Sequence, residues 1–386
     1  MITFKEFIDK KPLYYKKIDH TRVHQAYSIL KPHIKKPLTV HIVGTNGKGS
    51  TGRIMATLLH YQNVKVGHFS SPHIVSFNER IWIEGKDIDD SSLENAHKRL
   101  YTILGQEMSI SLSYFEYTTL LALVAMEKLE VIILEAGLGG EFDATNVVSK
   151  DLTVVTPIGL DHQEFLGNTI EEIATTKLNS IEKRAIISFQ PDNRVYTLAQ
   201  KIAKKRLSKL YLLKDLSLNS DILSITETLG WSYYLYENAQ LAINALLILS
   251  LPFNIQDLKF VNLFGRFYQL APNITIDVGH NLLAVDAVSK AIESRYGDKK
   301  IILVYNSLDD KDYSAILSKL KQYIKRVEII PIDTNRAIDK AILTKELKRL
   351  SIEFEMFKSI KKDEDYLVFG SFFVVESFIK KNLLQI

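Results

Sequence analysis

The chain has 386 residues, of which 46% are hydrophobic and 24% charged, with 49 Lys and Arg against 45 Asp and Glu and no cysteine. This length predicts two domains with separate cores, and the composition is that of an ordinary globular protein. The basic residues are scattered along the sequence, which argues against a nucleic-acid partner, and the lack of cysteine excludes disulfides, thiolate metal sites and a cysteine nucleophile.

The N-terminal segment and the longest apolar runs indicate whether the protein is exported or inserted into a membrane. Residues 1–11 alternate charged side chains with single apolar ones and lack the apolar stretch of a signal peptide. The apolar runs at 120–126 and 242–251 are shorter than the ~20 residues that a membrane span needs. We therefore expect a cytoplasmic protein with no membrane partner, and we expect it to be a monomer.

Short apolar runs in the first part of the chain predict an α/β domain built on a mostly parallel sheet. The runs at 131–135 and 152–156 are continuous rather than alternating, as expected for strands buried on both faces. Apolar-periodic stretches between them predict the crossover helices of right-handed β-α-β units. The predicted strands cover residues 38–43, 65–69, 131–135 and 152–156, and the predicted helices cover residues 51–61, 117–128 and 169–181.

The alternation of strands and helices starts again near residue 266 and predicts a second, independent α/β unit of ordinary domain size. We therefore expect two domains, residues 1–263 and 264–386. The polar, alternating segment 217–231 predicts short antiparallel strands at a sheet edge. In the second unit the predicted strands cover 274–278, 300–305, 327–331 and 366–369, and the predicted helices cover 282–295, 313–323, 339–350 and a last stretch ending near Lys381.

The sequence GTNGKGS at residues 44–50 lies between a predicted strand and a predicted helix. Its glycines let backbone N–H groups fold around a phosphate, Lys48 neutralises phosphoryl oxygens, and the start of the helix adds its dipole. The spacing is a variant of the common G-x-x-x-x-G-K-[ST] pattern, because only two residues separate the first two glycines and a third glycine follows Lys48. A simple turn with a solvated lysine is the alternative, which the flanking strand and helix disfavour.

Three other polar residues carry competing interpretations. Glu135 ends a predicted buried strand, where a carboxylate is costly unless it meets a cation, so a metal ligand is favoured over a salt bridge. From the sequence alone, His162 is more simply a satisfied loop histidine. Lys177 lies on a predicted helix after two glutamates, and the same reasoning makes it a lysine on an exposed helix face.

Further motifs follow the glycine loop in a fixed order. They are Ser70-Ser71-Pro72-His73, Asn78-Glu79-Arg80, Tyr114-Phe115-Glu116-Tyr117, Glu135-Ala136-Gly137-Leu138-Gly139-Gly140, Asp143-Ala144-Thr145-Asn146, Leu160-Asp161-His162, Lys177, Gly265-Arg266-Phe267 and Asp277-Val278-Gly279-His280-Asn281. This ordered set closely resembles the folylpolyglutamate synthase family of the Mur ligase superfamily, over nearly the whole chain. The resemblance implies a P-loop ATPase domain with a mostly parallel sheet, followed by a smaller Rossmann-like α/β domain.

The resemblance also implies a metal site and a modified lysine. In the family, the residues that match Ser71, Glu135 and His162 hold Mg²⁺ against the nucleotide phosphates, through the oxygen ligands that magnesium prefers and one imidazole. The lysine that matches Lys177 is carbamylated, which turns a cation into an anion that supports the metal and the γ-phosphate.

Nucleotide and amino-acid contacts follow from the same resemblance. Asn244 matches an adenine-contacting asparagine, although it is otherwise an ordinary helix-surface amide. Arg266 and Asp277 match residues that close over the nucleotide from the second domain, with an interdomain salt bridge as the structural alternative for the arginine. The expected ATP-binding residues are Thr45, Asn46, Gly47, Lys48, Gly49, Ser50, Asn244, Arg266 and Asp277; the expected catalytic residues are Lys177, Lys48 and His280.

The resemblance further implies a pteroate site. In the family it uses the segments that match Ser113–Glu116 and Phe142–Ala144, although Phe115 is equally plausible as a core residue. His280 and Ser371 resemble contacts to the amino-acid substrate. The expected substrate-binding residues are Ser113, Tyr114, Phe115, Glu116, Phe142, Asp143, Ala144 and Ser371.

Together these features imply an ATP- and Mg²⁺-dependent ligase that joins L-glutamate to dihydropteroate and to reduced folates through an acyl phosphate. One alternative is a folylpolyglutamate synthase without the first activity. A second is another Mur-type ligase acting on a nucleotide-linked sugar, which the lack of an added N-terminal sugar-nucleotide domain disfavours. A third is a P-loop switch protein, which has no reason to need glutamate.

Overall fold

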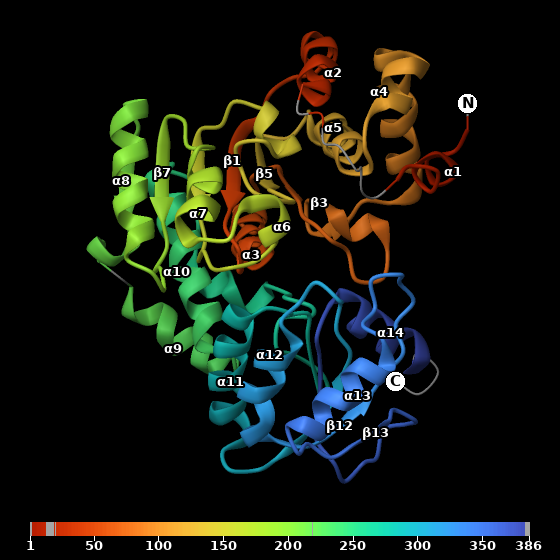
Figure 1. Ribbon diagram of the computed structural model, residues 1–386. Coiled ribbons are helices and arrows are strands. Elements are labelled where there is room, and N and C mark those ends of the chain that lie inside the picture. The colour runs from red at the N-terminus through yellow and green to blue at the C-terminus, as the bar shows by residue number, and fades with distance from the viewer. Residues whose placement is uncertain (1, 13–18, 20, 218, 383–386) are drawn as a thin grey trace. The chain divides into compact units, whose positions relative to one another are not determined.

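The computed structural model describes residues 2–12, 19, 21–217 and 219–382 (Figure 1). The chain divides into two compact units. The first comprises the residues up to Ile222 together with Glu237–Val261, and the second comprises Leu223–Tyr236 together with the residues from Asn262 onward. The later break lies close to the boundary expected after residue 263, whereas the segment 223–236, expected in the first domain, clusters with the second unit.

An eight-stranded sheet forms the centre of the first unit. Its strands are β1 (Leu38–Val43), β2 (Val66–Phe69), β3 (Ile81–Ile83), β4 (Lys86–Asp87), β5 (Val131–Glu135), β6 (Leu152–Val155), β7 (Arg184–Ile187) and β8 (Lys209–Leu212). They lie in the order β4-β3-β2-β5-β1-β6-β7-β8. The pairs that involve β3 are antiparallel and the central pairs are parallel, as the continuous apolar runs predict. All four strands predicted in this region are therefore confirmed.

Helices cover both faces of this sheet. His68 of β2 lies against Gly52, whereas its neighbour Phe69 lies 5.9 Å from the ring of Phe115. Because successive strand residues point to opposite faces, the helices that carry Gly52 and Phe115 pack on opposite sides of the sheet. The α-helices of this region are α1 (Phe4–Ile8), α2 (Arg22–Leu30), α3 (Lys48–His60), α4 (Asp90–Ser111), α5 (Tyr114–Met126), α6 (Gln163–Leu166), α7 (Ile170–Leu178) and α8 (Arg194–Arg206), and the 3₁₀ helices are η1 (Lys31–His33), η2 (Phe77–Arg80), η3 (Ala144–Val147), η4 (Leu213–Asp215) and η5 (Ile255–Phe260).

The segment that links these helices to the second unit is helical. The helix α9 (Ser220–Thr228) occupies most of the segment 217–231, and α10 (Tyr233–Ile248) follows it. Ile222 and Thr226, which are four residues apart, are buried, and this is the spacing of one helix face. The predicted short antiparallel strands are therefore wrong, because the buried side chains recur with the helical period rather than every second residue.

The second unit is a smaller α/β structure of the Rossmann-like type. Its strands lie in the order β13-β12-β11-β14-β10-β9, and only the β9–β10 pair of the described ladder is antiparallel. The strands are β9 (Tyr268–Ala271), β10 (Ile274–Asp277), β11 (Ile301–Tyr305), β12 (Ile324–Ile329), β13 (Phe354–Met356) and β14 (Tyr366–Phe369), and the helices are α11 (Leu282–Tyr296), α12 (Tyr313–Leu320), η6 (Lys321–Tyr323), α13 (Lys340–Arg349) and α14 (Phe372–Asn382). The strands and helices predicted here are confirmed. Within the described ranges, every helix is too short or too polar to cross a membrane.

Candidate functional site

The glycine loop joins the end of β1 to the start of α3. Gly44 has φ 144°, and a Cβ atom there would lie 1.9 Å from Thr156 Oγ1. Gly47, the N-cap of α3, has φ 88°, and a Cβ atom there would lie 2.6 Å from Asn238 Oδ1. Both positions therefore require glycine. The loop leaves the first N–H groups of α3 free of intrahelical partners, which is the arrangement that binds a phosphate at a helix N-terminus.

Lys48 and Glu135 meet beside this loop. The Lys48 ammonium donates to the carbonyl oxygens of Gly44 and Thr45 at 3.3 and 3.1 Å, and its Nζ lies 4.0 Å from Glu135 Oε1. Glu135 is 5% exposed, and its Oε2 accepts a hydrogen bond from the Ser71 N–H at 3.2 Å. The structure thus brings together the lysine of the loop, the carboxylate that ends β5 and the serine that follows β2.

His162 adopts an unusual backbone conformation in the loop after β6. Its φ is 51°, in the left-handed region, and it is the N-cap of α6. Its N–H donates to Asp161 Oδ1 at 2.9 Å. Such a conformation is uncommon for a residue other than glycine and is held here by the local turn.

Lys177 is buried inside the first unit. The residue is 4% exposed, and its Nζ donates to the carbonyl oxygen of Gly44 at 2.8 Å. Burial, and next the nearby Lys48 cation, lower the pKa of Lys177 to about 7. A Cβ atom at Gly140 would lie 2.7 Å from the Lys177 carbonyl oxygen, so the loop after β5 packs tightly on α7. Lys177 therefore lies under the glycine loop and not on an exposed helix face.

Asn244 lies on α10 and is also buried. Its Nδ2 donates to the Gln240 carbonyl oxygen at 2.9 Å, four residues earlier on the same helix. The alternative of a helix-surface amide is thereby excluded. Asn238, on the same helix, lies against Gly47 of the loop.

In the second unit, the expected site residues follow two adjacent strands. Asp277 ends β10 and is paired in register with Phe369, the end of β14. His280 follows β10, and its Nδ1 lies 3.0 Å from the Val278 carbonyl oxygen. Ser371 follows β14, and its Oγ accepts from the Val374 N–H at 3.2 Å, which caps α14. Because parallel strands end at one edge of the sheet, these residues share that edge.

Asp277 accepts hydrogen bonds from three protein donors. It accepts hydrogen bonds from the Phe267 N–H at 2.8 Å, the Gly279 N–H at 2.7 Å and the Tyr234 hydroxyl at 3.0 Å. Burial raises the pKa of Asp277, while Arg266 and these donors act in the opposite direction. The Arg266 guanidinium donates to the Gly265 carbonyl oxygen and lies 5.3 Å from the Phe372 ring, so within its unit it packs on an aromatic face.

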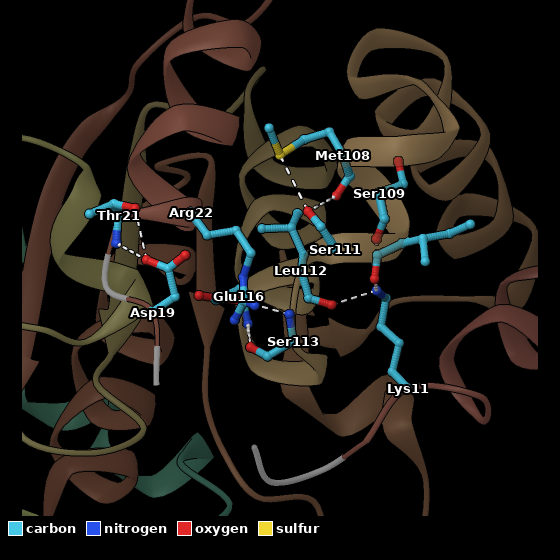
Figure 2. A network of polar contacts seen from close by, with 11 residues as sticks. Lys11, Asp19, Thr21, Arg22, Met108, Ser109, Ser111, Leu112, Ser113 and Glu116 are labelled. Atoms are coloured by element: carbon cyan, nitrogen blue, oxygen red, sulfur yellow. Dashed lines mark hydrogen bonds and ion pairs between the residues drawn. The ribbon is translucent and has the colours of Figure 1, made fainter. Parts of the chain in front are cut away.

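The segment Ser113–Glu116 forms the N-terminus of α5. Ser113 Oγ accepts from the Glu116 N–H at 3.2 Å, and Glu116 Oε2 accepts from the Ser113 N–H at 2.6 Å, which is a capping box. Arg22 donates to the same Oε2 atom from Nε at 3.1 Å and from Nη2 at 2.8 Å, as Figure 2 shows. The Glu116 carboxylate therefore fixes the start of α5 and pairs with α2.

The two aromatic residues of this segment differ in their surroundings. Phe115 packs against the core, and a Cβ atom at Gly137 would lie 2.5 Å from its ring. Phe115 therefore packs as a core residue, which is one of the two interpretations that the sequence allows. Tyr114 is partly buried, and the Arg80 guanidinium lies 5.3 Å from its ring centroid.

The segment Phe142–Ala144 combines one exposed and two buried residues. Phe142 is 55% exposed, whereas Asp143 and Ala144 are buried. Asp143 accepts from the Leu138 N–H at 2.8 Å, and from the N–H and hydroxyl of Thr145 at 2.9 and 2.5 Å. Burial raises the pKa of Asp143, against the effect of these donors. The carboxylate therefore shapes the loop on which Phe142 is displayed.

Similarity to known proteins shows the family to which the chain belongs. No family model matches the sequence. The chain is 32% identical over 368 residues to a dihydrofolate synthase/folylpolyglutamate synthase of Buchnera aphidicola subsp. Schizaphis graminum, with 87% of this chain and 86% of that protein covered. The chain belongs to the dihydrofolate synthase/folylpolyglutamate synthase family. The resemblance drawn from its motifs is confirmed.

Solved structures of the dihydrofolate synthase/folylpolyglutamate synthase family share the fold. Folylpolyglutamate synthetase of Helicobacter pylori is 38% identical, with a TM-score of 0.79 over 99% of this chain and 98% of that one. A bifunctional folylpolyglutamate synthase/dihydrofolate synthase from Yersinia pestis, complexed with AMPPNP and Mn ion, is 26% identical, with a TM-score of 0.81 over 98% of this chain and 97% of that one. The expected fold class, a Mur ligase-like α/β domain with a smaller α/β domain, is confirmed.

The residues around Glu135 suit the divalent cation that this family's fold implies. Ser50 Oγ, in the first turn of α3, is buried and has no hydrogen-bond partner among the described residues. A buried hydroxyl without a partner is costly and is a suitable oxygen ligand for a hard cation. The described part of the chain contains no cluster of three or more His, Asp or Glu side chains able to hold a metal by themselves. A site here therefore depends on hydroxyl oxygens and on phosphate or water in addition to Glu135.

Two cations that support the start of α5, Lys11 and Arg22, belong to none of the motifs seen in the sequence. Lys11 Nζ donates to the carbonyl oxygens of Ser109 and Leu112 at 2.7 and 2.6 Å (Figure 2). It also lies 4.7 Å from the Phe7 ring centroid. Burial lowers the pKa of Lys11 to about 8, against the effect of Glu116. Lys11 and Arg22 lie about a hundred residues before their partners, and no local pattern in the sequence joins positions that far apart.

Proposed function

We propose that this protein is an ATP-dependent ligase that joins L-glutamate to dihydropteroate, forming dihydrofolate, and to reduced folates, extending a glutamate chain. The family membership supports this, because relatives at about the same length carry both activities in their names. The observation that carries the proposal is the cluster of Lys48, Glu135 and Ser71 beside a glycine loop that only glycine can form. A loop of this kind without a metal carboxylate would fit a binding protein equally well.

In the proposed reaction, an oxygen of the acceptor's carboxylate attacks the γ-phosphorus of ATP and ADP leaves. The product is an acyl phosphate. The amino group of glutamate then attacks the acyl carbon, phosphate leaves, the nitrogen loses a proton, and an amide bond is formed. The protein contributes mainly orientation and charge neutralisation.

In this proposal the phosphates of ATP lie on the N–H groups of Gly47, Gly49 and Ser50, and Lys48 turns from its backbone carbonyl partners to the phosphoryl oxygens. Mg²⁺ would be held by Glu135, Ser71 and His162, and the partnerless Ser50 hydroxyl offers a further oxygen. When bound, the cation supplies charge stabilisation to the phosphoryl group. The Mn ion with AMPPNP in the Yersinia pestis relative supports a divalent metal here.

We further propose that Lys177 is carbamylated. Carbamylation forms a bond between Nζ and the carbon of CO₂ and releases a proton to solvent, and it requires the neutral amine. Burial supplies that form, because the pKa of Lys177 is lowered to about 7. The carbamate would then replace a buried cation by an anion near the metal site. An unmodified amine in an active preparation, shown by mass spectrometry of the native protein under CO₂, would refute this part.

For the second unit, we propose contacts to nucleotide and glutamate. Arg266 and Asp277 are assigned to the nucleotide, and His280 and Ser371 to the amino acid. Their common sheet edge supports this, since ligands of open α/β sheets bind beyond the carboxyl ends of the strands. Asn244 is assigned to adenine, and its buried place on α10 near Asn238 and the loop supports it.

The acceptor is assigned to the segments Ser113–Glu116 and Phe142–Ala144. Phe142, exposed on its loop, offers a ring for stacking on a pterin, and Ser113 and Tyr114 lie at the N-terminus of α5. Glu116 and Asp143, whose carboxylates already accept several hydrogen bonds, would act chiefly by shaping these segments. The monomeric state and cytoplasmic location expected from the sequence stay predictions.

One experiment tests the function. Purified protein is given ATP, Mg²⁺ and L-glutamate with either dihydropteroate or tetrahydrofolate, and ADP release and product mass are followed. Glutamate-dependent ADP release with a mass increase of one glutamyl residue on both acceptors is the expected result. Activity on tetrahydrofolate alone would reduce the function to chain extension, and ADP release that does not depend on glutamate would indicate a switch-like ATPase instead.

A further inference from the structure

A buried chain of hydrogen bonds connects β1 to the segment assigned to the acceptor. His41 Nε2 lies 2.8 Å from Thr145 Oγ1, and Thr145 Oγ1 lies 2.5 Å from Asp143 Oδ1. All three side chains are buried. His41 and Thr145 are 104 residues apart in the sequence, so the contact ties the strand before the glycine loop to the start of η3.

The direction of the protons in this chain follows from its members. Asp143 Oδ1 and Oδ2 accept from the N–H groups of Thr145 and Leu138, so the carboxylate is the acceptor of the Thr145 hydroxyl as well. The hydroxyl has one proton, which it gives to Asp143, and His41 must then donate from Nε2. His41 Nδ1 has no hydrogen-bond partner among the described residues. Burial, and next the Lys150 cation, lower the pKa of His41 and keep the ring neutral.

The position of His41 on the sheet explains why it reaches this segment. It is paired in register with Leu134 of β5, which belongs to the same core as α5. Residues paired in register share a face of the sheet, so His41 points to the side of α5 and away from α3. The chain then reaches Gly44 three residues later. The strand β1 thus ends in the glycine loop, and its residue His41 contacts the segment that precedes η3 and is assigned to the acceptor, Phe142–Ala144.

The residue that precedes the segment Phe142–Ala144, Glu141, is held by the C-terminal part of α7 and the residue that follows it. The Glu141 N–H donates to the Thr176 carbonyl oxygen at 2.9 Å, and Asn179 Nδ2 donates to Glu141 Oε2 at 2.7 Å. Phe142 lies between this anchor and Asp143. The loop is therefore fixed on both sides of its exposed aromatic residue, and on the Asp143 side the fixing passes through Thr145 to His41.

We propose that His41 is a positioning residue for acceptor recognition: acting through the Thr145 hydroxyl, it orients Asp143 and so sets the geometry of the segment Phe142–Ala144. This inference rests on the proposed function. His41 does not touch the acceptor or the reacting atoms, so its effect appears in the KM for the acceptor rather than in the affinity for ATP. Loss of the Nε2 donor should raise that KM about tenfold, within the range of 10² that small misplacements of a binding group cause.

The test measures kcat and the KM values for dihydropteroate and ATP in four proteins: wild type, His41→Leu, Thr145→Val and the double variant. Each single variant is expected to raise the KM for dihydropteroate about tenfold with the KM for ATP changed less than about twofold. Because both substitutions break one chain, the double variant should be no worse than either single one. A double variant whose effects multiply, or equal increases in both KM values, would overturn the proposal.

Two matched controls separate positioning from general damage. His41→Gln keeps an N–H donor near the place of Nε2 and should stay within about threefold of the wild-type KM. His68→Leu changes a second buried strand histidine, one that faces α3 and has no partner for either ring nitrogen among the described residues, and it should leave the KM for dihydropteroate unchanged. A His41→Gln variant as impaired as His41→Leu would contradict the role of the donor.

If His41→Leu does not fold, Thr145→Ser and Thr145→Val carry the test, because they differ by the hydroxyl. The serine variant should keep a near-normal KM, and equal KM values for the two would refute the chain. The failure of the proposed function would look different. In that case wild-type protein would show no glutamate-dependent ADP release with either acceptor, whereas normal wild-type turnover with an unaltered KM in His41→Leu would reject only the role of His41.

Discussion

Lys177→Met should make the first unit more stable while it abolishes ligation. The lysine is buried beneath the glycine loop, where its ammonium group meets one carbonyl oxygen, that of Gly44, and no acidic side chain within hydrogen-bonding distance in the described contacts. Methionine has a similar length and no charge, so it fills the same space without a cavity. A residue kept at a cost to stability is typical of a functional site.

The magnitude follows from the pKa. In the folded protein the pKa of Lys177 is lowered from 10.5 to about 7. Between these values the unfolded chain holds a proton that the folded protein has lost, so the free energy of unfolding rises with pH. The penalty is complete below pH 7 and amounts to about 4 kcal/mol at pH 7 and about 2 kcal/mol at pH 9. Since Lys177→Met also loses a hydrogen bond worth about 1 kcal/mol, its net gain should be about 3 kcal/mol at pH 7 and about 1 kcal/mol at pH 9.

The assay is urea unfolding followed by circular dichroism at pH 7, 8 and 9, in bicarbonate-free buffer so that the amine stays unmodified. Lys201→Met, which changes an exposed lysine of α8, serves as the control and should show no pH-dependent difference from wild type. Glutamate-dependent ADP release is measured on the same samples with bicarbonate restored. A stability difference that is constant from pH 7 to pH 9, or a variant that keeps its turnover, would refute the reasoning.

Three further substitutions test other parts of the site. Glu135→Gln should leave the fold intact and lower turnover at least ~100-fold, or ~2.7 kcal/mol of transition-state stabilisation; near-normal turnover at saturating Mg²⁺ would remove it from the metal site. Gly44→Ala places a Cβ atom 1.9 Å from Thr156 Oγ1 and should weaken binding of a fluorescent ADP analogue at least tenfold, so an unaltered affinity would contradict the loop geometry. Arg22→Met leaves the buried Glu116 carboxylate without its cation and should lower the free energy of unfolding by about 1–3 kcal/mol in urea, and an unchanged midpoint would show that the pair is not stabilising.

The strands and helices that follow local sequence patterns could be predicted from the sequence. The strands at 38–43 and 131–135 are runs of mostly apolar residues, and the first ends at a glycine-rich loop that indicates a tight turn before a helix. The helix α9 could not be predicted from the sequence, because its segment is polar and its apolar and polar residues alternate over a few positions as in a strand. Its buried residues recur every four positions only when the whole helix is considered.

Which residues form the site stays a prediction, and the structure adds the contacts that each of the expected site residues makes. Glu116 and Asp143 were expected as direct contacts, and their carboxylates prove to be occupied by backbone N–H groups and by Arg22 or Thr145. Pairings such as Arg22 with Glu116 join positions 94 residues apart, which only the folded chain defines. The burial of Lys177 could not be predicted either, because its helix carries charged neighbours that make it look exposed.

The central place of β1 has a consequence for how the protein is made. Leu38 is paired with Val131 of β5, and Val40 is paired with Leu152 of β6. The strand β1, which ends in the glycine loop, therefore acquires both neighbouring strands only after more than a hundred further residues have been synthesised. Parallel pairing over such separations is slow, and until then an apolar strand presents open edges to other chains. We therefore expect nascent chains that end before residue 152 to keep at least one edge of β1 open, and we expect the glycine loop to take shape late in folding.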